Sequence, residues 1–394
     1  MKPSPFTLLC TTGLFAIFSS TISKSPTLPL FTSYLGGDPS MIGMVAAVSA
    51  FTGIAVSIPA GILADRWGKK RMLVISAVVF ASAPFLYLLV TEIWQLAIIR
   101  FYHGLATAIF VPVAMALIAG LFHGERGEKI GWFSTATLIG RFMAPVVGGA
   151  IIGAMALNPE IGYKVVYIVC GGAGILVLLL ALKIPDPDNG AKNHRNWKET
   201  LSALRTVISN KGILFTSVVE AAILFAYGTF ETFMPLYSLK IGLSAYVVGI
   251  FLSAQVITLA LTKPVMGRFS DKHGRRPQIF TGALLGAACI GAFSFFTSFA
   301  PLLILSVLFG LSLSIVTSAT SALIADLSTK ETHGAAMGTL GSIMDMGHTA
   351  GPLFSGFIAA YFGLAFSFTG ASAILLFFAF VFLRGTIRPK PSTS

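Results

Sequence analysis

Apolar runs of about 20 residues or more, long enough for a helix to cross a bilayer, recur along the whole sequence. Asp, Glu, Lys and Arg together make up only 11% of the 394 residues. A soluble domain carries about a quarter of its residues as charges, so this composition argues against one. The pattern predicts an all-α membrane protein. Its twelve transmembrane helices are expected at residues 6–34, 41–63, 72–91, 94–120, 130–153, 162–183, 213–239, 245–267, 278–298, 301–325, 335–361 and 364–384.

The basic residues are distributed unevenly between the two sides of the predicted spans. The net charge is +12, and 21 of the 27 Lys and Arg fall in the tails, in the loops or at the span ends on the same side as the N-terminus. An excess of Lys and Arg marks cytoplasmic loops. We therefore expect a multi-pass protein of a bacterial cytoplasmic (inner) membrane, with both termini in the cytoplasm. The excess charge then serves orientation and contact with anionic membrane lipids, and no nucleic-acid partner is expected.

The chain also repeats itself at a fixed offset. Asp65 and Asp271 stand 206 positions apart, and the segment ALIAGL (116–121) matches ALIADL (322–327) at the same offset. Such repeats suit a protein that rocks one half against the other around a central site. The expected parts are an N-terminal six-helix bundle at 1–183, a cytoplasmic connector at 184–212 and a C-terminal six-helix bundle at 213–394.

Several motifs carry a resemblance to a known family. GILADRWGKKRML, which begins at residue 61, resembles the loop signature G-x-L-A-D-R-x-G-R-K-x-x-L of the major facilitator superfamily, and GRFSDKHGRRP (267–277) is a degenerate second copy. RFYHGLATA (100–108) resembles the fourth-helix motif built on Arg and Gly. GRFMAPVVGG (140–149) is similar to the fifth-helix signature G-x-x-x-G-P-x-x-G-G of proton-coupled exporters. The resemblance implies two pseudo-symmetric six-helix bundles, and it favours the bacterial twelve-helix drug/proton antiporter-type exporters.

The charged loop between the second and third spans is a candidate conformational latch. Glycines at both ends of its motif permit a tight turn, and its aspartate is expected to cap a helix of the opposite half. The basic residues anchor the loop to the cytoplasmic face. The alternative is a positive-inside anchor with no role in gating. The candidate latch residues are Gly61, Asp65, Arg66, Gly68, Lys69, Lys70 and, in the second copy, Asp271.

The fifth-span motif predicts a bend and close helix contact at Gly140, Pro145, Gly148 and Gly149. The segment departs from the family signature at Ala144, where a glycine is usual before the proline. It departs again at Arg141, where an apolar residue is common.

Charges inside the predicted spans are the candidate transport residues. A charge at the centre of a membrane costs about 2.5–3.5 kcal/mol on insertion scales, so each is expected to have a partner or a function. Glu220 and Glu231 fall on one helix face with Tyr227, and Lys24 stands 207 positions before Glu231, which predicts a similar depth for the two. The candidates for proton coupling or for lining a cavity are Lys24, Arg100, Arg141, Glu220, Tyr227, Glu231, Asp345 and His348.

These features favour a secondary active transporter that exports small amphipathic molecules or drugs by alternating access, coupled to protons. A carboxylate in a low-dielectric site can exchange protons near neutral pH, as such coupling requires. The expected partners are a small-molecule substrate, protons and membrane lipids, and we expect a monomer. No nucleotide-binding loop and no cluster with metal-ligand spacing is present, so no cofactor and no metal is expected.

Two other functions stay open at this point. The first is a dedicated exporter or facilitator of one polar metabolite, sugar or metal-chelating acid, in which Lys24 and the arginines bind anionic groups. The second is a membrane-embedded enzyme or sensor. The sequence offers no nucleophile–base constellation and no soluble output domain for it, so we expect a chain that is not an enzyme.

Overall fold

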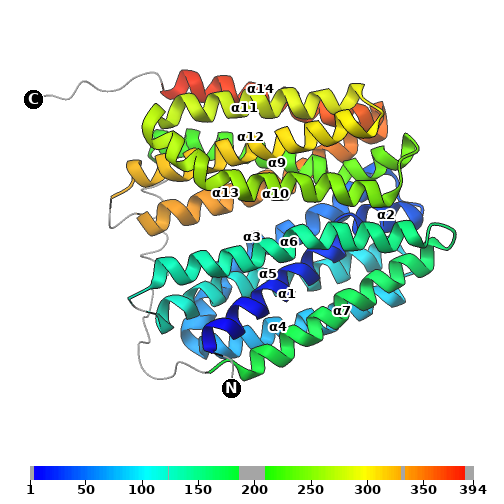
Figure 1. Ribbon diagram of the computed structural model, residues 1–394, viewed down its shortest axis with the longest axis horizontal. Helices are drawn as coiled ribbons and strands as arrows, with labels where there is room; N and C mark the ends of the chain where they lie inside the picture. Colours follow the sequence, from blue (N-terminus) through cyan, green and yellow to red (C-terminus); the bar gives the residue numbers. More distant parts are fainter. Residues whose placement is uncertain (1–3, 123, 186–208, 330–332, 387–394) are drawn as a thin grey trace, which may run out of the picture. The chain divides into compact units, whose positions relative to one another are not determined.

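The computed structural model describes residues 4–122, 124–185, 209–329 and 333–386, and its regular structure is helical throughout (Figure 1). The first helices are α1 (Pro5–Lys24), α2 (Thr27–Tyr34), α3 (Pro39–Trp67), α4 (Lys69–Leu86), α5 (Ile93–Leu121), α6 (Arg126–Ala154) and α7 (Pro159–Lys183). The later helices are α9 (Lys211–Lys240), α10 (Ala245–His273), α11 (Arg275–Ala292), α12 (Phe299–Leu327), α13 (His333–Phe362) and α14 (Leu364–Thr386). Most of the expected connector, residues 186–208, lies outside the described part.

Eleven segments of the described chain are long and apolar enough to cross a membrane, and the first of them is α1 with α2, Pro5–Tyr34. α13 is a thirty-residue helix outside that set, because Asp345, His348 and several glycines lower its hydropathy. Together these make twelve long helical segments, so the predicted all-α fold is confirmed. The first segment is not one continuous helix as predicted. It breaks between Lys24 and Thr27, where Pro26 has no backbone N–H to donate.

A glycine ends the second membrane span of each repeat, α3 in the first and α10 in the second. Gly68 separates α3 from α4 with φ 96°, and Gly274 separates α10 from α11 with φ 92°. A positive φ of this size strains any residue with a Cβ, which explains the glycine at both turns. Gly61, which we expected to form the turn with Gly68, instead lies inside α3. The turn therefore depends on Gly68 alone.

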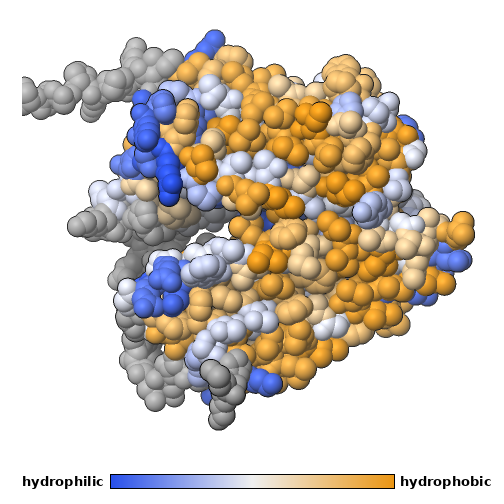
Figure 2. Space-filling view, viewed as in Figure 1, coloured by the Kyte–Doolittle hydropathy of each residue, from blue (hydrophilic) through white to orange (hydrophobic). Residues whose placement is uncertain are grey.

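The chain forms two compact units. The first unit consists of Met1–His194 with Glu231–Ser253, and the second of Arg195–Phe230 with Ala254–Ser394. On the visible face, apolar side chains cover the middle of the helices and hydrophilic side chains gather towards the helix ends (Figure 2). That distribution is expected for helices that cross a bilayer and end at its polar surfaces.

Small residues bring the helices of each unit close together. In the first unit α1 runs along α6 (Figure 1), and a Cβ on Gly140 would collide with the carbonyl of Leu14. In the second unit, a Cβ on Gly347 would collide with the carbonyl of Ala221. Helices in lipid associate through such close van der Waals packing, because lipid tails provide no hydrophobic drive between them.

Candidate functional site

Lys24 and Glu231 form an ion pair in the first unit. Lys24 Nζ lies 2.7 Å from Glu231 Oε2, with side-chain exposures of 21% and 9%. Lys24 is the last residue of α1, where the negative end of the helix dipole favours a cation. Glu231 lies in the second half of α9. Two residues that stand within one position of the repeat offset are therefore in direct contact.

Arg100 lies on α5, and only 1% of its surface is exposed. Its Nη1 donates hydrogen bonds to Ser23 Oγ at 3.2 Å and to Tyr87 Oη at 3.5 Å, whereas its Nε has no partner among the described residues. The Tyr87 ring stacks on Tyr167, with ring centroids 4.3 Å apart. The charge of this guanidinium is therefore met by neutral hydroxyl groups.

His103 lies next to this arginine, and we did not predict it from the sequence. It is buried on α5 one turn after Arg100, and its Nδ1 is 3.5 Å from the Ser23 hydroxyl that Arg100 also contacts. Neither His103 Nε2 nor Tyr167 Oη has a hydrogen-bond partner in the described part of the chain. The spacing of Arg and His in RFYHG was the available signal, since residues three apart share a helix face.

Arg141 adds a third cation near the ion pair. Its side chain on α6 is exposed, and both it and Arg100 are close enough to Lys24 for their charges to interact with it. We call Lys24, Arg100 and Arg141 the basic cluster. No carboxylate in the described part of the chain forms an ion pair with Arg100 or Arg141.

The fifth-span motif places α6 against two neighbours within the first unit. α6 is one helix that contains Pro145, and its Gly140 faces the backbone of α1. A Cβ on Gly148 would lie 3.4 Å from Ile22, whereas one on Gly149 would meet the carbonyl of Ala245 at the start of α10. The small residues thus fix how closely α1 and α10 approach α6, the helix that carries Arg141.

The second unit holds the other candidates. Tyr227 and His348 are stacked, with ring centroids 5.3 Å apart and an angle of 15° between the rings. Asp345, one turn before His348 on α13, is exposed. Glu220 is 1% exposed, and neither carboxylate oxygen has a hydrogen-bond partner in the described chain. Thr320 lies near Glu220, but its hydroxyl donates to a backbone carbonyl of its own helix.

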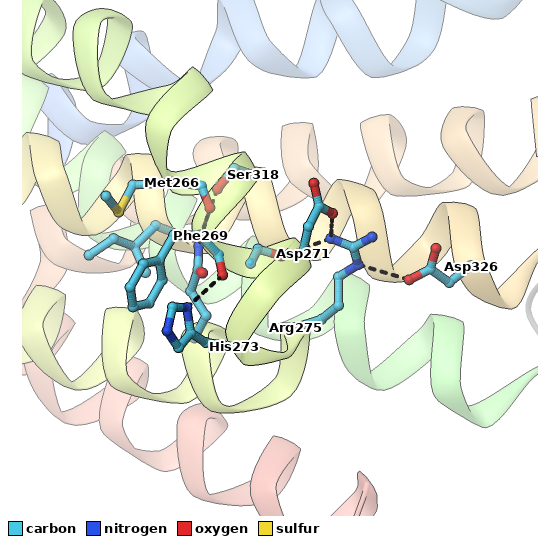
Figure 3. Close-up of polar contacts among 10 residues, drawn as sticks. Met266, Phe269, Asp271, His273, Arg275, Ser318 and Asp326 are labelled. Carbon is cyan, nitrogen blue, oxygen red and sulfur yellow. Dashed lines mark hydrogen bonds and ion pairs between the residues drawn. The ribbon is translucent and has the colours of Figure 1, made fainter.

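An ion-pair network joins three helix ends of the second unit (Figure 3). Arg275 Nε donates to Asp326 Oδ2 at 2.8 Å, and Arg275 Nη1 donates to Ser270 Oγ at 3.0 Å and to Asp271 Oδ1. This Arg275 network links α10, α11 and α12. Asp326 was missing from our expected site. The signal was the single difference between ALIAGL and ALIADL, which puts an acid at the end of α12.

The first unit has a glycine where this network has its second acid. At the repeat offset, Lys69 corresponds to Arg275 and Gly120 to Asp326. Lys69 Nζ lies 3.5 Å from where a Cβ on Gly120 would stand, so the two positions face each other. Arg66 is exposed and Lys70 half-buried. The structure does not describe the surroundings of Gly61 and Asp65.

Comparison with known proteins identifies the family. The sequence matches the family model of the Major Facilitator Superfamily over residues 9–254 and 239–394. The chain belongs to the major facilitator superfamily. It is therefore a secondary transporter and not an enzyme, and the resemblance carried by the loop motif is confirmed.

Relatives with similar sequences include transporters of both bacteria and archaea. The chain is 27% identical over 364 residues to the multidrug resistance protein MdtG of Escherichia coli, covering 89% of this chain and 87% of that protein. It is 24% identical over 346 residues to an uncharacterised MFS-type transporter of Methanocaldococcus jannaschii, covering 86% and 88%.

Solved structures show the same fold at lower identity. A bacterial homologue of the human lysosomal transporter Spinster superposes with a TM-score of 0.85 at 16% identity, over 100% of both chains. The nucleoside transporter NupG superposes with a TM-score of 0.79 at 14% identity, over 98% of this chain and 100% of that one. At these identities the likeness shows the fold alone.

Proposed function

We propose that the chain is a proton-coupled exporter of small amphipathic molecules in a bacterial cytoplasmic membrane. The Lys24–Glu231 ion pair carries the proposal, because it joins α1 to α9 inside the membrane-spanning segments and remains partly exposed. The fifth-helix motif at 140–149 and the similarity to MdtG support export and a drug-like substrate. Both termini lie in the cytoplasm in this proposal, and the transporter works as a monomer.

The ion pair is the proposed coupling element. Two opposite charges about 4 Å apart attract each other by about 4 kcal/mol at an effective dielectric constant of about 20. A proton on Glu231 removes this attraction and frees α1 from α9. The bundles at 1–183 and 213–394 then rock apart on the extracellular side, so proton entry favours the outward-open state.

The segment around Gly68, formed by the end of α3 and the start of α4, is the proposed cytoplasmic latch of the same cycle. Asp65 holds the cytoplasmic side closed by capping a helix of the opposite half, while Arg66, Lys69 and Lys70 hold the loop at the lipid surface. The sequence of GILADRWGKKR supports this role, because an anchor alone would not need its aspartate.

Proteoliposomes with an imposed proton gradient test the proposed coupling. A pH-sensitive dye inside the vesicles reports proton movement when each compound of a panel of amphipathic cations, anions and neutral molecules is added. We expect at least one compound to drive proton flux through the wild-type protein, and Glu231→Gln to transport that compound without proton flux. Glu160→Gln is the matched control, since Glu160 pairs with Lys164 at an exposed helix start. Equal proton coupling in Glu231→Gln and wild-type protein would contradict the proposal.

A further inference from the structure

The cations of the first unit outnumber the acids that could neutralise them inside the membrane. The basic cluster contributes three positive charges, and Glu231 is the acid that reaches it, through Lys24. The other acidic residues of this unit stand at helix ends or in loops, as the positions of Asp38, Glu92 and Glu160 illustrate. The membrane-spanning part of the unit therefore holds about two more positive charges than negative ones among its described residues.

Arg100 shows that the excess is built into the fold. Its guanidinium is buried, its hydrogen-bond acceptors are the hydroxyls of Ser23 and Tyr87, and its Nε is unpartnered in the described chain. Buried arginines are ordinarily paired with carboxylates, which accept bidentate charge-assisted hydrogen bonds. Here the fold holds the cation in place with neutral groups, and no described carboxylate forms an ion pair with it.

The other two cations are less buried than Arg100. Lys24 keeps 21% of its side chain exposed despite the ion pair, and Arg141 is exposed on α6. A cationic ligand would have to approach Glu231 against three positive charges, and this carboxylate is only 9% exposed and already bonded to Lys24. An anionic ligand meets the opposite situation, because each cation of the cluster attracts it.

We propose that the basic cluster binds the acidic group of the transported molecule, so that the cargo is an amphipathic organic anion with a carboxylate, phosphonate or phosphate. Arg141 and Lys24 contact the anionic group. Arg100 does not touch the anionic group. It is a positioning residue that raises the positive potential at Lys24 from its place behind Ser23. The inference rests on the proposed export function and names its class of substrate.

Binding of two probes with the same apolar body and opposite charge tests this directly. Phenylphosphonate and phenyltrimethylammonium are titrated calorimetrically into the purified full-length protein, with no proton gradient present. We expect phenylphosphonate to bind saturably and phenyltrimethylammonium at least about tenfold more weakly. Arg141→Gln is expected to weaken phenylphosphonate binding about tenfold, as for the loss of one charge-assisted hydrogen bond, while Arg141→Lys retains most of it.

The matched control is Arg126→Gln, which removes an exposed cation from the first turn of the same helix and should leave phenylphosphonate binding unchanged. Three outcomes would overturn the inference: no saturable phenylphosphonate binding, equal or tighter binding of phenyltrimethylammonium, or unchanged phenylphosphonate binding in Arg141→Gln. Because no gradient is used, anion binding can succeed where proton coupling fails, and the two proposals are judged separately.

Discussion

The two copies of the charged loop share a backbone but differ in their side chains. Both turn at a glycine with positive φ, Gly68 in one and Gly274 in the other. In the second unit Arg275 is held between two acids of that unit, whereas in the first unit Lys69 faces Gly120. Duplication thus preserved the turn, which geometry requires, but the second acid of the ion-pair network, Asp326, has Gly120 as its counterpart in the first copy. We infer that the second loop serves stability and that the first is left free to act as the latch.

The largest expected effect comes from neutralising the two loop aspartates one at a time. This tests whether the first loop acts as the latch while the second serves stability. Asp65→Asn should slow transport about tenfold, the change produced by about 1.4 kcal/mol in the barrier. Asp271→Asn should have a smaller effect on transport, because Arg275 keeps its hydrogen bond to Asp326. Transport rates in proteoliposomes at equal protein content measure both. Equal rates for Asp65→Asn and the wild type would remove the latch.

Restoring the missing acid makes the first loop resemble the second. Gly120→Asp places a carboxylate beside Lys69, and the new pair should stabilise the protein by about 0.2–1 kcal/mol, the range for partly exposed ion pairs. If the first loop must be mobile, the same variant should also transport more slowly. Thermal unfolding in detergent and transport rates are compared with Gly120→Asn, which has the same shape without the charge. A Gly120→Asp protein no more stable than Gly120→Asn would show that the two positions do not pair.

The smallest expected effect concerns the starts of α3 and α10, at the opposite side of the membrane, where the two repeats also differ. Asp38 caps α3, and hydrogen bonds from the Ser40 hydroxyl and from the Met41 N–H lower the pKa of its carboxyl. Its repeat counterpart before α10 is Ser244, which does not titrate in this range. A lowered pKa means that the stabilisation is present above the unfolded pKa and is lost as the pH falls through the folded pKa.

The protection of the first-turn amides, which is their hydrogen exchange corrected for its intrinsic pH dependence, should therefore fall in acid for α3 and stay level for α10. Asp38→Ala should abolish the pH dependence and cost about 1 kcal/mol, the usual value of such a cap. A first turn of α3 whose exchange shows the same pH dependence in wild type and Asp38→Ala would rule out the cap as its cause.

Periodic and repeated features were the part of the structure that could be predicted from the sequence. Long apolar runs show the helices, and the separation of 207 positions, one more than the repeat offset, indicated a similar depth for Lys24 and Glu231. The break after Lys24 was missed, because an apolar run around Pro26 is as consistent with a kinked helix as with two helices. α13 shows the reverse difficulty, since its polar residues reduce the hydropathy on which the assignment of spans depends.

Contacts that depend on how a helix is rotated about its axis could not be predicted from the sequence. Whether Arg100 points towards a carboxylate or towards the hydroxyls of Ser23 and Tyr87 depends on how α5 turns against α1 and α4, which no periodicity specifies. Asp326 could have been found, because the repeat alignment already placed it opposite Gly120.

The central claim is that Lys24 and Glu231 act as a pair in proton-coupled transport. The most direct measurement is a charge swap, Lys24→Glu with Glu231→Lys, compared with each single substitution in proteoliposomes under a proton gradient. Each single variant leaves two like charges in contact, since the groups are 2.7 Å apart, and should lose most activity. The double variant should recover a substantial part of it at equal expression and folding. Single variants that change only substrate affinity, together with a double variant that recovers nothing, would contradict the account.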